Sequence, residues 1–367
     1  MAKVHSRRVV IKVGTGVLTL GVGQLNAPLI GELCNRILKW QEVGHEVLLV
    51  SSGAVGLGMG SLGMEHRPVD MPTLQACAAI GQSSLVETWK HGFDQHGVLI
   101  AQVLLTRDDL RSRQRHVGVR DTLEKLLSRG VVPIINENDT VSYEEIKFGD
   151  NDVLSALVAS LVNADTLIIL STVAGLMDRE VGGALVPVVD AITPEIETMA
   201  GGTQSATAVG GMASKIESVK VASQSDCGVF IADGAVPENL DLILAGKNPG
   251  TFFVPSSAGL KARKRWLAFF QDSEGALIVD EGARKALIIE GGSLLAKGIC
   301  GVRDSFKRET VVRIECPEGE VFARGICPFS SEEIQALMGE ENSVVRDKFP
   351  GVGKGEVVHR DSLALCR

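Results

Sequence analysis

The sequence predicts an α/β protein in which helices cover both faces of a mainly parallel β-sheet. Along the first two thirds of the chain, short apolar runs rich in β-branched residues alternate with stretches of helical spacing. The runs are apolar throughout, which is the pattern of strands buried on both faces. With 367 residues, 45% of them hydrophobic, the chain can bury a large core and form more than one domain.

The individual elements follow from these runs. Apolar positions at helical spacing predict a helix over residues 30–40, between the first two strands. In a sheet of this kind ligands bind at the carboxyl ends of the strands, so the residues that follow each run are candidates for function. The six predicted strands are Val9–Val13, Val47–Val50, Leu99–Leu104, Val131–Ile135, Leu167–Leu170 and Val229–Ile231.

Small and polar residues follow four of the six strands. Each end alone can be turn chemistry, since Gly, Ser and Asn are common in turns. Together they predict a ligand site, in which backbone N–H groups around Gly14 and Ser52 hold phosphate or carboxylate oxygens. The four ends are Gly14-Thr15-Gly16, Ser51-Ser52-Gly53, Asn136-Glu137-Asn138-Asp139 and Ser171-Thr172.

Three polar residues, Asp150, Asn151 and Asp152, stand directly before a helical pattern. One of them can act as the N-cap of that helix, and the sequence leaves this alternative open. At the positive end of a helix dipole both carboxylates stay ionised. Ionised carboxylates organise cations such as lysine ammonium groups, Mg²⁺ or a substrate amine, so the cluster is also a candidate functional site.

A Gly210-Gly211 pair opens another predicted helix, which carries Lys215 in its first turns. The P-loop spacing G-x-x-x-x-G-K-[ST] is absent from the chain, and a flexible surface loop is the alternative interpretation of the pair. Lys12, in the first strand, supplies a second ammonium group. Two lysines with backbone donors suit a transferring phosphoryl group, whose catalysis depends on positioning and charge stabilisation.

Composition argues against several other classes of protein. The formal net charge of -8 disfavours a general nucleic-acid binder. The seven cysteines are scattered and form no C-x-x-C pair, so neither a disulfide framework nor a protein-built metal site is expected. The N-terminal apolar run is too short for a signal peptide, and no run of about 18 apolar residues occurs, so we expect a cytoplasmic protein with no membrane contact.

Six blocks of the sequence resemble known families and together span nearly the whole chain. Five resemble the amino acid kinase family: IKVGT at 11–15, SSGA at 51–54, PIINEND at 133–139, EIKFGDND at 145–152 and GGMASK at 210–215. The sixth, residues 279–299, resembles the PUA domain. The resemblance implies the amino acid kinase fold over residues 1–258, a linker over 259–274, and a small β-rich PUA-like barrel over 275–367.

The NEND and GDND pair is most similar to the family members that act on glutamate. It implies phosphorylation of the γ-carboxylate of L-glutamate by ATP with Mg²⁺, which begins proline biosynthesis. That carboxylate is ionised at neutral pH, so no general base is required. The implied catalytic residues are Lys12, Lys215 and Asp152, with Asp152 holding the two lysines. The implied glutamate-binding residues are Ser52, Gly53, Asn136, Asp139, Asp150 and Asn151. The implied nucleotide-binding residues are Lys12, Gly14, Ser171, Thr172, Val209, Gly210, Gly211, Met212, Ala213, Ser214 and Lys215.

Four positions depart from the family pattern. Gly16 stands where a serine is usual, Thr172 where an aspartate is frequent, and Val209 where a threonine is common. We expect the contacts of these three side chains to differ from those in the family. In the PUA-like block, Phe306-Lys307-Arg308-Glu309 lacks the glycine that usually precedes the acidic residue, so an altered turn is expected there.

Two alternative functions remain at this level: another carboxylate kinase of the same family, and an RNA-binding protein, because PUA domains occur in RNA-modifying enzymes. Residues 275–367 hold 13 Lys and Arg against 15 Asp and Glu, a net of -2, whereas RNA surfaces usually have a basic excess. We therefore expect an interaction or regulatory module and no nucleic-acid partner. A homo-oligomer and feedback inhibition by L-proline are also expected. The only aromatic candidates for base stacking are Phe306, Phe322, Phe329 and Phe349.

Overall fold

The computed structural model describes residues 7–141, 151–178, 182–201, 211–256, 273–350 and 355–365. The chain divides into two compact units, residues 1–259 and residues 260–367. Most of the predicted linker and the basic run at 261–265 fall outside the described residues.

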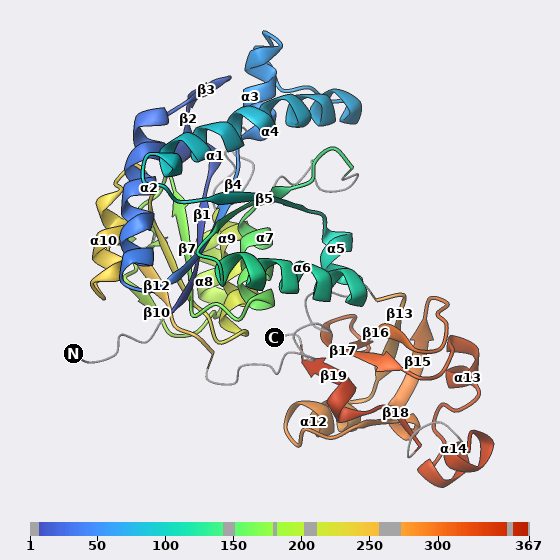
Figure 1. The fold of residues 1–367 in the computed structure, drawn as a ribbon. Helices are drawn as coiled ribbons and strands as arrows, with labels where there is room; N and C mark the ends of the chain where they lie inside the picture. Colours follow the sequence, from blue (N-terminus) through green and yellow to red (C-terminus); the bar gives the residue numbers. More distant parts are fainter. Residues whose placement is uncertain are drawn as a thin grey trace. The chain divides into compact units, whose positions relative to one another are not determined.

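An eight-stranded sheet forms the centre of the first unit (Figure 1). Its strand order is β10-β12-β11-β7-β1-β4-β6-β5, and every neighbouring pair is parallel except β11 and β12. All six predicted strands are confirmed, and with them the mainly parallel sheet. The strands are β1 (Arg8–Val13), β4 (Glu46–Ser51), β5 (Ile100–Leu105), β6 (Val132–Glu137), β7 (Thr166–Ser171), β10 (Val188–Val189), β11 (Gly228–Asp233) and β12 (Thr251–Phe253).

Helices cover both faces of this sheet (Figure 1). One face carries α2 (Ala27–Glu42), α4 (Met71–Asp94) and α10 (Glu238–Leu244). The other carries α6 (Arg113–Leu127), α7 (Asn151–Leu161), α8 (Pro194–Ala200) and α9 (Met212–Ser223). The predicted helix over 30–40 lies within α2, which begins after the side-chain cap Asn26. The remaining short elements are α1 (Thr15–Leu18), α3 (Ala54–Ser61), α5 (Arg107–Arg111), β2 (Thr19–Gly21), β3 (Gln24–Leu25), β8 (Met177–Asp178) and β9 (Ala184–Leu185).

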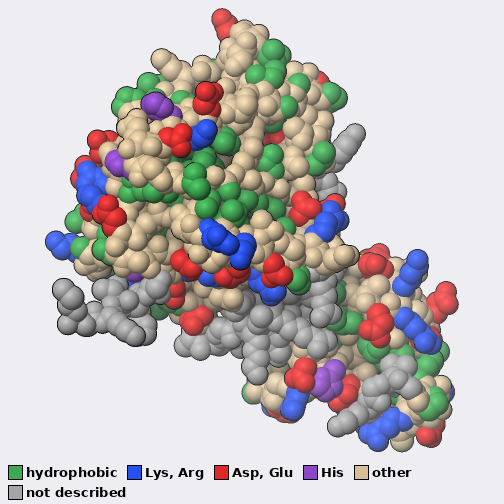
Figure 2. Space-filling model, viewed as in Figure 1, with side chains coloured by type: hydrophobic (Ala, Val, Ile, Leu, Met, Phe, Trp, Pro, Cys, Tyr) green, Lys and Arg blue, Asp and Glu red, His purple; other side chains and the backbone are tan. Residues whose placement is uncertain are grey.

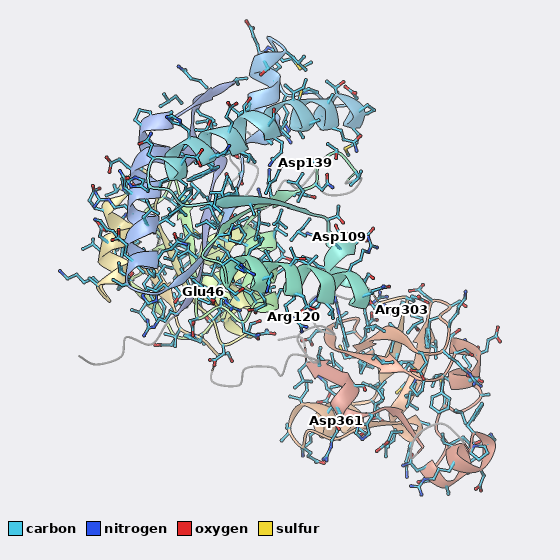
Figure 3. The ribbon with its side chains drawn as sticks, in the orientation of Figure 1. Glu46, Asp109, Arg120, Asp139, Arg303 and Asp361 are labelled. Carbon is cyan, nitrogen blue, oxygen red and sulfur yellow. The ribbon has the colours of Figure 1, made fainter. Side chains whose placement is uncertain are left out.

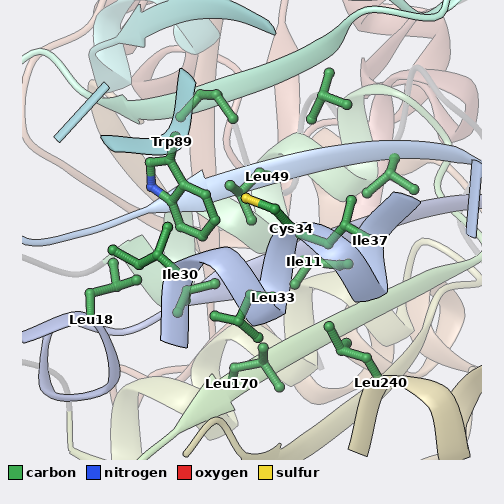
Figure 4. Packing of buried hydrophobic residues seen from close by; sticks show 14 of the residues in the cluster. Ile11, Leu18, Ile30, Leu33, Cys34, Ile37, Leu49, Trp89, Leu170 and Leu240 are labelled. Carbon is green, nitrogen blue, oxygen red and sulfur yellow. The ribbon is translucent and has the colours of Figure 1, made fainter. Parts of the chain in front are cut away.

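The alternation of β1 decides which side chains reach the site. Val9, Ile11 and Val13 are buried in the hydrophobic core between the sheet and α2, where Leu33 and Trp89 also pack (Figure 4). Successive side chains of a strand point to opposite faces of the sheet. Lys12 therefore points away from this core, toward the face that α7 and α9 cover.

The second unit is a separate strand-rich domain with its own hydrophobic core. Its five-stranded sheet has the order β15-β13-β16-β17-β19, and a two-stranded ribbon pairs β14 with β18. The strands are β13 (Gly275–Val279), β14 (Leu294–Leu295), β15 (Ile299–Arg303), β16 (Thr310–Glu315), β17 (Val321–Cys327), β18 (Glu356–Val358) and β19 (Leu363–Leu365), and the helices are α12 (Glu281–Ile288), η2 (Ala296–Gly298), α13 (Ser331–Gln335), α14 (Asn342–Lys348) and η3 (Arg360–Ser362).

Three of the four phenylalanines considered for base stacking lie in this core: Phe306, Phe322 and Phe329 are each at most 5% exposed. Phe349 is half-buried and packs edge-on against Phe329. The packing of these rings stabilises the domain. Figure 2 shows positive and negative side chains mixed over the visible face of this unit.

The altered turn expected at 306–309 has a left-handed residue at Glu309, with φ 59°, so the acidic residue itself adopts the conformation that favours glycine. Among the helices that the structure describes, none is long and apolar enough to cross a membrane.

Candidate active site

Asp152, the second residue of α7, lies between two lysines from different elements. Its Oδ2 accepts a hydrogen bond from Lys215 Nζ of α9 at 2.9 Å, and its Oδ1 forms an ion pair with Lys12 Nζ of β1. The three residues are almost fully buried, with exposures of 0% for Asp152, 6% for Lys12 and 5% for Lys215. The structure thus joins three residues that stand far apart in the sequence.

The electrostatics of this cluster favour an anionic ligand. Burial raises the pKa of the Asp152 carboxyl, but the neighbouring Lys12 and Lys215 lower it more, so the net shift is downward and the carboxylate is ionised. Two ammonium groups around one carboxylate leave one excess positive charge in a poorly solvated place. Such an excess charge favours an anionic group, and phosphate is one.

A second polar cluster lies on the β4 and β6 side of Asp152. Asn151, the first residue of α7, donates through Nδ2 to Ser52 Oγ at 2.9 Å and to Asn136 Oδ1 at 2.8 Å. Asn136 Nδ2 in turn donates to Oε1 of Gln82, in α4, at 2.8 Å. The four residues are each at most 9% exposed. Three residues predicted to bind the acceptor are therefore in direct contact.

The side chains of Asn151 and Asp152 contact β1, β6, α9 and the end of β4. The capping alternative, which needs only one of the three residues, therefore rests on Asp150. Asp150 lies outside the described residues.

The expected backbone donors also need correction. Gly14 N–H donates to Leu170 O at 3.1 Å and Ser52 N–H to Val13 O at 3.3 Å, so both groups take part in the sheet and are not free for a ligand. Thr15 and Gly16 are instead the first two residues of α1, where N–H groups have no acceptor within the helix.

The remaining candidates lie around these two clusters. Gly53 is the N-cap of α3 with φ 112°, a conformation that favours glycine. Asp139 is half-buried and lies beyond the end of β6 (Figure 3). Ser171 ends β7, and Thr172 follows it, with its Cγ2 only 2.8 Å from where a Cβ on Gly16 would lie.

The predicted glycine-lysine segment meets the first cluster at the start of α9. Gly211 is the N-cap residue, and Met212 and Ala213 form the first turn with Ser214, whose Oγ donates to Asp152 Oδ2 at 3.4 Å. Val209 and Gly210 lie outside the described residues.

Two residues of α4 near the site were not predicted from the sequence. Gln82 belongs to the second cluster, and Trp89 donates through Nε1 to Ser51 Oγ at 2.9 Å, next to Ser52. Both are buried, at 9% and 0% exposure. Together with Leu85 they have the i, i+3, i+7 spacing of one buried helix face. A glutamine on an otherwise apolar face is a weak local signal of a polar contact, and it does not identify the partner.

The described part of the chain contains no group of three or more His, Cys, Asp or Glu side chains placed to hold a metal ion. Both carboxylate oxygens of Asp152 already contact lysines. Mg²⁺ that accompanies a nucleotide takes most of its ligands from phosphate oxygens and water.

The chain is similar to known proteins over nearly its whole length. The Amino acid kinase family profile matches residues 7–233, and the PUA domain profile matches residues 275–348. The chain is 47% identical to "Glutamate 5-kinase" of Syntrophotalea carbinolica, covering 98% of this chain and 97% of that one. It is 43% identical to "Glutamate 5-kinase" of Myxococcus xanthus, with 98% and 96% covered. A carbamate kinase from Giardia lamblia bound to AMP-PNP matches 68% of this chain and 99% of its own, at 16% identity and a TM-score of 0.49.

Proposed function

The chain belongs to the amino acid kinase family, and we propose that it transfers the γ-phosphoryl group of ATP to the γ-carboxylate of L-glutamate, the first step of proline biosynthesis. The observation that carries this proposal is the buried Lys12–Asp152–Lys215 cluster, with its excess positive charge beside the amide cluster of Ser52, Asn136 and Asn151. The near full-length similarity to glutamate 5-kinases supports the same acceptor.

The chemistry follows from the charges. An oxygen of the ionised γ-carboxylate attacks the γ-phosphorus of ATP, and the bond to the β–γ bridging oxygen breaks as the new bond forms, so that L-glutamyl 5-phosphate and ADP result. No proton has to be removed from the acceptor, and the main barrier is repulsion between two anions. Lys12 and Lys215 lower this barrier by neutralising charge on the transferring group, and Asp152 fixes both ammonium groups.

The remaining residues divide between the two substrates. We assign Ser52, Gly53, Asn136 and Asn151 to glutamate, with Asp139 and the undescribed Asp150 at the same pocket. The nucleotide side consists of Lys12, Gly14, Ser171, Thr172 and the segment 209–215. Mg²⁺ enters as a complex with ATP and neutralises its phosphates. Homo-oligomerisation and a cytoplasmic location stay predictions.

An ATP-dependent hydroxamate assay tests the function directly, because hydroxylamine traps an acyl phosphate. L-glutamate, N-acetylglutamate, aspartate and carbamate are compared at equal concentrations. Product from L-glutamate at a kcat/KM far above the others is expected. A preference for another acceptor would establish the alternative carboxylate kinase, and no turnover with any acceptor would overturn the proposal.

A further inference from the structure

The hydrogen bonds of Asn136 fix the direction of a chain of three amide side chains. Asn136 Oδ1 accepts from the backbone N–H of Glu137 at 2.9 Å and from Asn151 Nδ2 at 2.8 Å. Its Nδ2 must then face Gln82, where a donor requires an acceptor, and Gln82 presents Oε1 at 2.8 Å. Turning the Gln82 amide around would set two donors against each other.

With the amides oriented in this way, one donor and one acceptor remain without a partner at the two ends of this series of three side chains. Gln82 Nε2 and Asn151 Oδ1 are both buried, and within the described part of the protein neither has a hydrogen-bond partner. A buried polar group without a partner is costly, typically ~1–3 kcal/mol, and native proteins keep few of them. Two such groups at one cluster indicate a ligand that accepts at one end and donates at the other.

We propose that Gln82 is a specificity-determining residue for the acceptor, and that its Nε2 donates to the α-carboxylate of the amino acid while Asn151 Oδ1 accepts from the α-ammonium group. This inference rests on the proposed function. An α-amino acid satisfies both free ends at once, because it carries an anionic acceptor and a cationic donor on one carbon atom.

The strand order places Gln82 at the correct end of the acceptor. Lys12 is on β1, whereas Gln82 hydrogen bonds to Asn136 on β6, and β4 lies between these two strands. The γ-carboxylate must lie near Lys12 to receive the phosphoryl group. The other end of glutamate, with its α-substituents, then extends toward β6 and Gln82.

Two variants separate the proposed contact from a structural role. Gln82→Glu keeps an oxygen that accepts from Asn136 Nδ2 but replaces the free donor by a negatively charged acceptor. Gln82→Met removes both hydrogen-bonding atoms. Gln95→Glu makes the same substitution at the exposed C-cap position of α4 and serves as the matched control. Thermal unfolding verifies that each variant is folded.

The acceptor 4-aminobutyrate is the informative probe, since it retains the γ-carboxylate and the amine of glutamate but lacks the α-carboxylate. It is assayed as a substrate or, at high concentration, as a competitor of glutamate. Gln82→Glu is expected to raise the glutamate KM about ten- to hundredfold, the range for a lost hydrogen bond to a charged group, with the ATP KM unchanged. The affinity for 4-aminobutyrate should change less than about threefold.

Three outcomes decide the matter. Selective loss of glutamate affinity in both Gln82 variants, with Gln95→Glu normal, supports the contact. Equal losses of affinity for glutamate and 4-aminobutyrate would show that Gln82 has only a structural role. An unchanged glutamate KM in Gln82→Glu would overturn the proposal. Absence of glutamate phosphorylation in the wild type would instead overturn the proposed function, so the two failures are distinguishable.

Discussion

At the scale of the residue, Asp152 is the most consequential side chain, because two buried lysines depend on it. Asp152→Asn leaves their positive charges uncompensated, and removing one partner of a buried ion pair typically costs about 3–5 kcal/mol. We expect a loss of that order in urea unfolding and a fall in kcat of several orders of magnitude. Asp94→Asn, at an exposed ion pair with Lys90, should change either quantity little.

The difference in unfolding free energy between the wild type and Asp152→Asn depends on pH because the pKa of Asp152 is lowered in the folded protein. A carboxyl whose folded pKa lies below its unfolded value stabilises the protein above the unfolded pKa, and this contribution is lost as the pH falls through the folded pKa. The stability gap between wild type and Asp152→Asn should thus be constant near neutral pH and shrink below about pH 4. A gap that widens on acidification would contradict the ionised carboxylate.

Gly16 and Thr172 are coupled by packing. A Cβ on Gly16 would lie 2.8 Å from Thr172 Cγ2, closer than carbon atoms approach. Gly16→Ala should therefore raise the ATP KM severalfold, and Thr172→Ser, which removes that methyl group, should restore it. A double-mutant cycle is expected to give a coupling of about 0.5–3 kcal/mol. Strictly additive effects would show that the two departures from the family pattern are independent.

Lys12, Asp152 and Lys215 could be identified from the sequence because each lies in a block that resembles the amino acid kinase family. It did not reveal Gln82, because one amide on an apolar helix face gives no local sign of its partner. Its meaning depends on Asn136, 54 residues away in the sequence. The prediction that the backbone N–H groups of Gly14 and Ser52 are free for a ligand was wrong for a related reason. The register of the sheet decides which backbone donors stay free, and the sequence does not show it.

At the scale of the element, the close packing of α3 on α4 positions the amide cluster. An ideal Cβ on Gly81 would lie 1.9 Å from Ala54 O, so only glycine fits there. Gly81→Ala must separate the helices, and we expect a loss of about 1–3 kcal/mol or more in unfolding free energy with a raised glutamate KM. Gly56→Ala, with open space around it in the same α3, should be neutral or stabilise by up to about 1 kcal/mol. Equal stability of the two variants would contradict the packing argument.

Apolar runs predicted the buried strands, whereas no helix was predicted over the segment that forms α4. Strands β1, β4, β6 and β7 are apolar runs between turn residues, which few other structures produce. The face that α4 buries includes Cys77, Ala78 and Gly81, whose small side chains give a weak periodic signal. The small residues that allow close helix packing therefore weaken the hydrophobic periodicity by which a helix is predicted.

At the scale of the whole molecule, we expect the acceptor pocket to bind the end product of the pathway. L-proline keeps the α-carboxylate and a cationic α-nitrogen but has no side-chain carboxylate to accept phosphate. If Gln82 and Asn151 hold mainly these groups, proline binds without reacting and raises the apparent glutamate KM with little change in kcat. Gln82→Glu should weaken proline inhibition and glutamate binding together. An unchanged rate at sub-saturating glutamate in the presence of proline would exclude shared-pocket inhibition.

The two units differ in what they contribute to the reaction. Every candidate site residue lies before residue 216, within the unit that ends at Gly259, and each unit has its own hydrophobic core. A unit with a complete core can fold alone. A chain that ends at Ser273 should therefore stay folded and retain kcat within severalfold of the full chain, as measured by the hydroxamate assay and thermal unfolding. Its regulation or assembly is expected to change, because we expect the C-terminal domain to act as an interaction or regulatory module. A soluble, folded chain of this length without turnover would show that the strand-rich domain completes the site.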